Sequence, residues 1–502
     1  MAVLFGALAS CAVIAITEPP GPGLGPDAMS YLGSARWLAG HGALRVPFED
    51  WSAPDSTSPL QHFPPGFPLA IAAPVALGAP PVQAARGIEA AAAFVTVAGA
   101  VWLVAAAAGT GAGAAAGVVL LASPSLAFDH WQILSEPLFL ALLVVTLALM
   151  VRGGRPWTYG TSAALAGLVR YAGAGVMGAT VLWAFGLRGR RAERLRRAGL
   201  AALPSLVLHG AWLVRNRLEA GPLPRGVRPQ GGLVPAAHEL GASLGAWLAP
   251  LVPASRSWAQ AAVAGIVALL ALAALAAAAR RSRVPEPGSP GGPRGRQLLA
   301  AAALLAAGYA AVVLWSRAFV FATIPFDQRL LSPFILLAEI ATVAAVGMVW
   351  RPWRRGARLA AGLGALLWIG ASGWATVLAV EDARDGGWGY ASDEWRASPA
   401  ARWLRTEARG AAIFSNDPAA VYAMTGRPSR GLPDSLDADS VAAFGRVLAD
   451  HHAILVRFSA ARGEGVSPDS LAGRLRLREV ARLADGVAWA AAVPRPPSRR
   501  AR

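Results

Sequence analysis

The stretch WAQAAVAGIVALLALAALAAAA, residues 258–279, decides the class of fold to which this chain belongs. Gln260 is its one polar side chain apart from the indole of Trp258. A helix on the surface of a soluble protein carries a polar stripe that repeats every three to four residues, and this stretch has none. Its length suffices for the about 20 apolar residues that a helix needs to cross a bilayer. The stretch therefore predicts a transmembrane helix.

The composition of the whole chain agrees with a membrane protein. The 502 residues are 55% hydrophobic and only 15% charged, whereas soluble domains contain roughly 25% charged residues. The formal net charge is +17, and all of the basic residues are arginine. Because the arginine clusters lie between apolar segments, membrane topology accounts for them, and we expect no nucleic-acid partner. A single cysteine, Cys11, excludes an intramolecular disulfide and a cysteine-based metal cluster.

Apolar segments recur along most of the chain, and we predict about eleven transmembrane helices from them. Several are shorter than a straight span requires, so their ends are approximate. The predicted helices cover residues 2–17, 88–108, 112–128, 132–151, 158–169, 171–187, 199–215, 257–279, 298–315, 333–350 and 358–379.

Four arginine-rich connections predict the orientation of these helices. They are RGGRP (152–156), RGRRAERLRR (188–197), RRSRVPEPGSPGGPRGR (280–296) and RPWRRGAR (351–358). With a cytoplasmic N-terminus, all four fall on the cytoplasmic side, as the positive-inside rule requires. The first loop, residues 18–87, and the C-terminal region then lie outside. We therefore expect a multi-pass protein of the bacterial plasma (inner) membrane whose chemistry faces outward.

The C-terminal region, residues 381–502, has a different character. Charged residues become more frequent, and short apolar runs such as AAIFSN (411–416) and AILVRF (453–458) alternate with helical patterns such as DPAAVYAMTG (417–426). This alternation predicts a small α/β domain. The expected organisation is a transmembrane domain over residues 1–380 and an extracytoplasmic α/β domain over residues 381–502.

The first outer loop contains an acid, Asp27, at the start of PDAMSYLGSARWLAGHGAL. Apolar residues recur there at helical spacing, which predicts a helix along the membrane surface. One interpretation of Asp27 is an N-cap carboxylate that the helix dipole favours, with a contribution of about 1 kcal/mol. The other interpretation is a functional acid. Both remain open from the local sequence.

Two more ionisable residues stand at the predicted outer ends of helices. Glu136 in DHWQILSEPLFLALLVV is typical of a first helical turn, but a carboxylate at a bilayer edge is costly unless it is solvated or paired. Arg170 in ALAGLVRYAGAGVMGA runs against the positive-inside trend. It could extend its guanidinium to the interface, or it could bind an anion such as a phosphate.

IPFDQRLLSPFILL places Asp327 and Arg329 just before another helix on the same side. The pair could simply begin that helix, or Arg329 could be a second anion ligand. His62 in HFPPGFP is less specific, since a lone histidine beside prolines is often loop surface. The seven histidines are scattered, so we predict no metal ligands.

Taken in order, these motifs resemble the GT-C fold glycosyltransferases. The resemblance is to the family-39-like branch, which includes protein O-mannosyltransferases, lipid A aminoarabinose transferases and RgtA/B/C/D-like bacterial proteins. It rests on the acid of the first loop and on HFPPGFPL, SEPLFLALL, LAGLVRYAGAGV and RLLSPF, and it covers roughly residues 1–350. Two departures stand out: Ala28 follows Asp27 where many relatives have a second acid, and Phe63 precedes Pro64 where aminoarabinose transferases have lysine.

The resemblance implies an enzyme, a hexosyl- or pentosyltransferase that moves a sugar from a polyprenyl-phosphate donor to an acceptor hydroxyl on a glycan, lipid or protein. Asp27 matches the catalytic acid and would act as general base, and inversion at the anomeric carbon is expected. Arg170 and Arg329 would stabilise the leaving phosphate. Glu136 matches a second acid that orients the acceptor or helps to bind a divalent cation, the one cofactor that the resemblance leaves open.

Tyr31, His62 and Asp327 are further candidates for substrate binding. A transporter or flippase for a lipid-linked or anionic substrate is the main alternative, but it would place ionisable residues near the bilayer midplane in broken helices. A non-enzymatic membrane scaffold that presents the C-terminal domain is a third interpretation. It gives the outward-facing Arg170 and Arg329 no role.

Overall fold

A computed structural model describes residues 1–48, 51–52, 57–221, 233–252, 254–281, 293–320, 325–350, 353–460 and 466–491. The chain divides into two compact units. The first comprises residues 1–22, 61–71 and 82–385, and the second comprises residues 23–60, 72–81 and 386–502. The predicted domain boundary at residue 380 lies close to the last passage from the first unit to the second.

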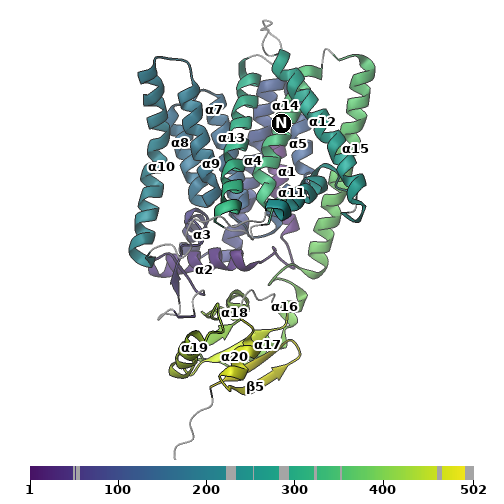
Figure 1. Ribbon diagram of the computed structural model, residues 1–502. Helices are drawn as coiled ribbons and strands as arrows, with labels where there is room; N and C mark the ends of the chain where they lie inside the picture. Colours follow the sequence, from purple (N-terminus) through teal and green to yellow (C-terminus); the bar gives the residue numbers. More distant parts are fainter. Residues whose placement is uncertain are drawn as a thin grey trace, which may run out of the picture. The chain divides into compact units, whose positions relative to one another are not determined.

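The first unit is a bundle of helices, many of which run side by side (Figure 1). Its elements are α1 (Ala2–Ile16), α4 (Pro81–Ala108), α5 (Thr110–Leu121), α6 (Pro124–Trp131), α7 (Glu136–Val151), α8 (Pro156–Val169), η1 (Tyr171–Gly173), α9 (Ala174–Gly186), α10 (Arg191–Ala220), α11 (Leu233–Leu248), η2 (Ala254–Arg256), α12 (Ser257–Arg281), α13 (Pro293–Phe319), α14 (Gln328–Trp350) and α15 (Arg355–Gly386). A further helix, α3 (Gly66–Ala76), spans the division between the units.

Every predicted apolar segment corresponds to helical structure. Among the described residues, six helices are long and apolar enough to cross a membrane, or seven if one bent pair counts as a single span. That pair, α5 and α6, corrects the continuous helix predicted over residues 112–128, because the chain bends by 56° between them. Pro124 begins α6 and lacks the amide hydrogen that a continuous helix would need. Four shorter apolar helices accompany these spans, and the count of eleven stays a prediction.

Close helix packing in this unit depends on two facing glycines. Gly175 on α9 and Gly308 on α13 meet so closely that a Cβ on either residue would collide with the backbone of the other helix. Side-chain-free positions let helices approach through their backbones, a common means of helix association in membranes. The resulting contact holds α9 closely against α13.

The second unit contains a four-stranded mixed sheet. Its elements are α2 (Pro26–His41), β1 (Arg45–Val46), β2 (Ser58–Pro59), α16 (Asp393–Ala397), α17 (Pro399–Thr406), β3 (Ile413–Ser415), α18 (Pro418–Thr425), α19 (Ala438–Asp450), β4 (Ile454–Phe458), α20 (Pro468–Arg474), β5 (Arg478–Leu483) and β6 (Gly486–Ala490). The strand order is β3-β4-β6-β5, with β3 parallel to β4 and the other pairs antiparallel. The sheet and the helices confirm the predicted α/β character of this region.

Side-chain caps explain where the short helices of this unit begin. Ser398, Asp417 and Asp437 each accept a backbone N–H of the first turn that follows them, at the starts of α17, α18 and α19. The core beneath these helices is apolar and aromatic, with Phe414 of β3 packed edge-to-face against Phe444 of α19 at 5.3 Å between ring centroids.

The predicted surface helix of the first loop is α2, and it belongs to the second unit. Ala28, Tyr31, Leu32 and Ala35 are buried, but so is every other residue from 28 to 35. This part of α2 is therefore enclosed on all sides, which corrects the predicted surface helix with a single buried face. The segment before α2 pairs with the chain that leads into α16. The N–H of Leu24 donates to the carbonyl of Trp388 at 3.2 Å, and the N–H of Tyr390 donates to the carbonyl of Leu24 at 2.8 Å. The first loop and the C-terminal region therefore fold together.

Candidate active site

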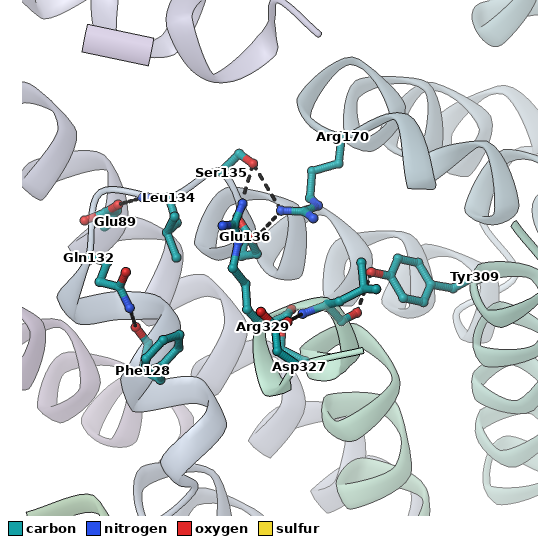
Figure 2. A network of polar contacts seen from close by, with 12 residues as sticks. Glu89, Phe128, Gln132, Leu134, Ser135, Glu136, Arg170, Tyr309, Asp327 and Arg329 are labelled. Carbon is teal, nitrogen blue, oxygen red and sulfur yellow. Dashed lines mark hydrogen bonds and ion pairs between the residues drawn. The ribbon is translucent and has the colours of Figure 1, made fainter. Parts of the chain in front are cut away.

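The centre of the site is Glu136, the first residue of α7, whose side chain is completely buried. The guanidinium groups of Arg170 and Arg329 both form ion pairs with its Oε1 atom (Figure 2). Ser135 joins them, because its hydroxyl donates to Glu136 Oε2 at 3.2 Å and accepts from Arg170 Nη1 at 3.4 Å. We call these four residues the arginine–carboxylate cluster.

Arg170 reaches this cluster because the α-helical structure is interrupted between the end of α8 and the start of α9. It lies directly after α8 with an extended backbone, φ −144° and ψ 135°, and the short helix η1 follows. The turn is tight, and a Cβ at Gly173 would collide with the backbone at Gly167. Glycine at this position therefore lets the chain fold back and present the guanidinium of Arg170 to Glu136.

Arg329 lies in the first turn of α14, and two neighbours fix that turn. The carboxylate of Asp327 accepts the N–H of Leu330 at 2.8 Å, which is the geometry of a helix cap. Tyr309 of α13 donates its hydroxyl to the carbonyl of Leu330 at 2.7 Å. Figure 2 shows both contacts beside Arg329. The structure thus gives Asp327, a predicted substrate-binding residue, the contacts of a cap.

A second support for Arg329 comes from α11, whose side chains hold the backbone of Phe326. Glu239 accepts the N–H of Phe326 at 3.2 Å, and the hydroxyl of Ser243 donates to its carbonyl at 2.5 Å. The buried Arg317 pairs with Glu239 at 3.4 Å. α11 therefore binds both the N–H and the carbonyl of Phe326, just before α14. These two hydrogen bonds set where α14 begins. We call Glu239 and Ser243 the α11 clamp.

Two further buried acids lie near Glu136, and neither was predicted from the sequence as a site residue. Glu89 of α4 accepts the N–H of Leu134 at 2.9 Å, and so supports the loop that leads into α7 (Figure 2). Asp129 of α6 is fully buried and lies close enough to Glu136 and the arginines to interact with their charges. An ionisable residue inside an apolar segment is itself a signal of function, and that signal would have found Glu89 in the segment 88–108 but not Asp129, which follows the segment 112–128.

His62 lies in a segment that is bound next to Arg170. The hydroxyl of Tyr171, the residue after Arg170, donates to the carbonyl of Gln61 at 2.9 Å. Trp212 of α10 donates to the same hydroxyl at 3.1 Å. His62 itself is exposed, and its ring packs edge-on against Phe63 at 4.7 Å between centroids.

Asp27 and Tyr31 belong to the second unit. Gly25 is the N-cap of α2, so the interpretation of Asp27 as the N-cap itself is wrong: Asp27 is the second residue of the helix, after Pro26. Its charge lies near enough to Tyr390 to raise the pKa of that phenol, although burial and the Asp417 carboxylate contribute more. Tyr31 is buried in this unit. The acid of the first loop is therefore placed by contacts with the C-terminal region.

The charges of the cluster define what it can bind. Two guanidinium groups face one carboxylate in the cluster, and the carboxyl groups of Asp129 and Asp327 lie close enough to interact with these charges. Arginine forks match phosphate oxygens in shape and charge, so an anion can join the cluster as a second acceptor. A cation would meet two guanidinium groups at Glu136. Among the described residues, no group of three or more His, Cys, Asp or Glu is placed to hold a metal ion.

Comparison with known proteins gives the fold a name. The sequence matches no protein-family model and no curated protein. Among solved structures, the chain is similar to the Archaeoglobus fulgidus oligosaccharyltransferase in complex with Zn and sulfate, with a TM-score of 0.54 and 11% identity over 91% of this chain and 68% of that one. The chain has the GT-C fold.

ArnT from Cupriavidus metallidurans bound to undecaprenyl phosphate is also similar, with a TM-score of 0.48 and 16% identity over 98% of each chain. The GT-C fold confirms the predicted architecture of a polytopic helical membrane protein. The sequence motifs implied this same architecture through their resemblance to GT-C glycosyltransferases.

Proposed function

We propose that this protein is a glycosyltransferase that moves a sugar from a polyprenyl-phosphate donor to an acceptor hydroxyl outside the bacterial plasma membrane. The observation that carries the proposal is the arginine–carboxylate cluster in a GT-C fold: Arg170 and Arg329 converge on the buried Glu136 from helices far apart in the sequence. In support, the ArnT structure contains undecaprenyl phosphate and the archaeal oligosaccharyltransferase was also solved with an acceptor peptide.

In the proposed reaction, an acceptor hydroxyl attacks the anomeric carbon of the donor sugar. A carboxylate, Asp27, takes the hydroxyl proton as the new C–O bond forms. The bond between the anomeric carbon and the phosphate oxygen breaks, and its electron pair leaves with the polyprenyl phosphate. Attack opposite to the leaving group inverts the anomeric configuration. The products are the glycosylated acceptor and polyprenyl phosphate, and the hydroxyl proton remains on the carboxyl group of Asp27.

Arg170 and Arg329 would stabilise the charge that develops on the leaving phosphate. Such preorganised donors in a partly water-excluded site contribute more than they do in water, because the surrounding dielectric is lower. Glu136 holds both guanidinium groups in place before the phosphate arrives, so little reorganisation accompanies the reaction. Glu136 is thus a positioning residue in this proposal, and Asp27 is the base.

A transporter fits the positions of these charges less well. Glu136 begins α7, Arg170 follows the end of α8, and Arg329 lies in the first turn of α14. The cluster is therefore built from helix ends, whereas transporters commonly bind their substrates near the middle of the membrane, between discontinuous helices.

The test is transfer by the purified full-length protein in liposomes that contain polyprenyl-phosphate hexose or pentose. Mass analysis of cell-envelope glycans and glycoproteins, with and without the gene, identifies the acceptor. The proposal expects one glycan to disappear without the gene and polyprenyl phosphate to be released when that acceptor is added. An unchanged envelope, together with movement of the intact donor across the bilayer, would overturn it in favour of a flippase.

A further inference from the structure

The second unit contains a cavity that the reaction described above does not use. It has a volume of about 570 Å³ and lies where the parallel strands β3 and β4 end. Ser415 and Asn416 at the end of β3, and Phe458 and Ser459 at the end of β4, form its floor and one side. Ligands of α/β folds commonly bind at the carboxyl ends of parallel strands, where the strand order changes direction.

The floor of this cavity is held rigidly by Asn416. Its side-chain amide donates to the carbonyl of Phe458 at 3.0 Å and its side-chain oxygen accepts the N–H of the same residue at 2.9 Å. Asn416 therefore extends the pairing of β3 with β4 by one position through its side chain. Asn416 thus holds the ends of the two strands together where they line the cavity.

The lining of the cavity also contains an ion pair. Arg457 Nη1 donates to both oxygens of Asp469, at 3.0 and 3.2 Å, and both side chains remain partly exposed. Ser467 adds a hydroxyl to Asp469 at 3.5 Å. Asp434 is a further exposed lining residue. The cavity thus offers carboxylate acceptors, guanidinium donors and hydroxyl groups that do both.

Leu432, Val466 and Pro418 line the same cavity with apolar surface. A sugar ring presents hydroxyl groups at its edge and C–H groups on its faces, so it can satisfy both kinds of wall at once. A phosphate would face two carboxylates, because Arg457 is already paired with Asp469. The volume falls within the roughly 300–1,000 Å³ of small-molecule sites. The chemistry therefore favours an uncharged, polyhydroxylated ligand.

We propose that this cavity is a carbohydrate-binding site that holds a neutral glycan segment. That this glycan segment is part of the acceptor rests on the proposed function, because a glycosyltransferase that extends a glycan gains affinity from a second contact with that glycan. The binding itself stands on the cavity alone and can be measured without transfer.

The experiment is saturation-transfer NMR on the full-length protein in detergent, with four probes: maltotriose, mannotriose, trigalacturonate and inorganic phosphate. We expect at least one neutral trisaccharide to bind, with signal transfer to its ring protons. Asp469→Asn should weaken this binding at least tenfold, and Ser459→Trp, which fills the cavity from an exposed position, should abolish it. Asp450→Asn, an exposed acid outside the cavity, serves as the matched control and should leave binding unchanged.

Two results would overturn the proposal: neither neutral trisaccharide binds, or their binding is the same in Asp469→Asn and Ser459→Trp. Preference for trigalacturonate or phosphate would equally reject a neutral ligand. The Glu136→Gln protein separates this proposal from the function above, because its transfer activity should fall by about 10- to 100-fold while its trisaccharide binding stays unchanged. Wild-type transfer with unaltered activity in Ser459→Trp and no trisaccharide binding would reject the cavity and retain the enzyme.

Discussion

Arg329 donates to the buried carboxylate of Glu136 across 193 residues of sequence. Arg170 binds the same oxygen from a third helix end, so one carboxylate connects α7, α14 and the break between α8 and α9. Two like charges therefore meet at one anion.

Glu136→Gln should lower transfer activity by about 10- to 100-fold. The amide keeps the shape of the side chain but not the charge that holds two guanidinium groups together, and displaced catalytic groups cost rates of this size. Initial rates in liposomes measure the effect. Glu193→Gln changes an exposed acid that pairs with Arg197 on α10, and it should leave the rate unaltered; an equal loss in both variants would contradict the role of Glu136.

Arg170→Ala should chiefly weaken use of the polyprenyl-phosphate donor, seen as a raised KM for that substrate. Arg329→Ala should also lower kcat, by about 100-fold if it stabilises the leaving phosphate. Because the two arginines share Glu136, the double variant should lose less than the product of the single losses. Arg196→Ala, an exposed arginine, is the control, and independent, fully additive effects of Arg170 and Arg329 would argue against a shared site.

Asp27→Asn should abolish sugar transfer while expression and membrane insertion stay at wild-type levels. The amide cannot accept the acceptor proton, although it retains the size of the carboxylate. Donor binding, measured by displacement of a labelled polyprenyl phosphate, should persist. Asp450→Asn in the same unit is the control, and retained transfer in Asp27→Asn would remove this residue as the base.

Loss of the α11 clamp should displace Arg329 without touching the chemistry. Ser243→Ala removes the donor to the carbonyl of Phe326, and we expect the KM for the donor to rise several-fold with a smaller change in kcat. Ser243→Thr retains the hydroxyl and should restore the wild-type KM. Glu219→Gln, a change to an exposed acid on α10, controls for general effects; a fall in kcat with unchanged KM would contradict a positioning role.

Asp417→Asn should flatten the pH dependence of stability in the second unit. Burial raises the pKa of the Asp417 carboxyl, against hydrogen bonds from Tyr390 and Ala420 that lower it. A raised pKa in the folded state means that this group contributes stability fully below its unfolded pKa of about 3.9, and that the contribution is lost as pH rises through the folded pKa. Asparagine still caps α18 but does not titrate.

The measurement is hydrogen exchange of peptides from residues 413–426 between pH 3 and pH 7, corrected for intrinsic exchange rates. Wild-type protection should fall as pH rises over this window more steeply than in Asp417→Asn. Asp450→Asn should follow the wild type. Identical slopes in all three proteins would show that Asp417 does not set the dependence.

Much of the fold was predictable because a transmembrane helix is recognisable in the sequence as a long apolar run, such as residues 258–279. The bend between α5 and α6 was missed because the apolar composition continues across Pro124, and hydropathy alone does not register a lost amide. β5 was missed because its side chains alternate weakly and four of its six residues are charged or alanine.

The site was predictable in part. Glu136, Arg170 and Arg329 were recognised as charges that the bilayer edge would not tolerate without partners, and the structure joins all three. That Asp327 caps α14 depends on the exact start of a helix, which no pattern fixes to one residue. The α11 clamp was beyond prediction, because the contacts between Ser243 and Phe326 arise from a packing of segments that the local sequence does not encode.

The pairing of Leu24 with Trp388 and Tyr390 has a consequence for the timing of synthesis. Ribosomes make Leu24 and Asp27 before helices α4 to α15, but the segment that binds Leu24, around Trp388 and Tyr390, is made only after α15. Until then the segment that carries Asp27 lacks the backbone partners of its folded state. The order of translation thus makes an unfinished chain a poor enzyme, and a truncation at residue 385 should leave the membrane helices without a placed acid.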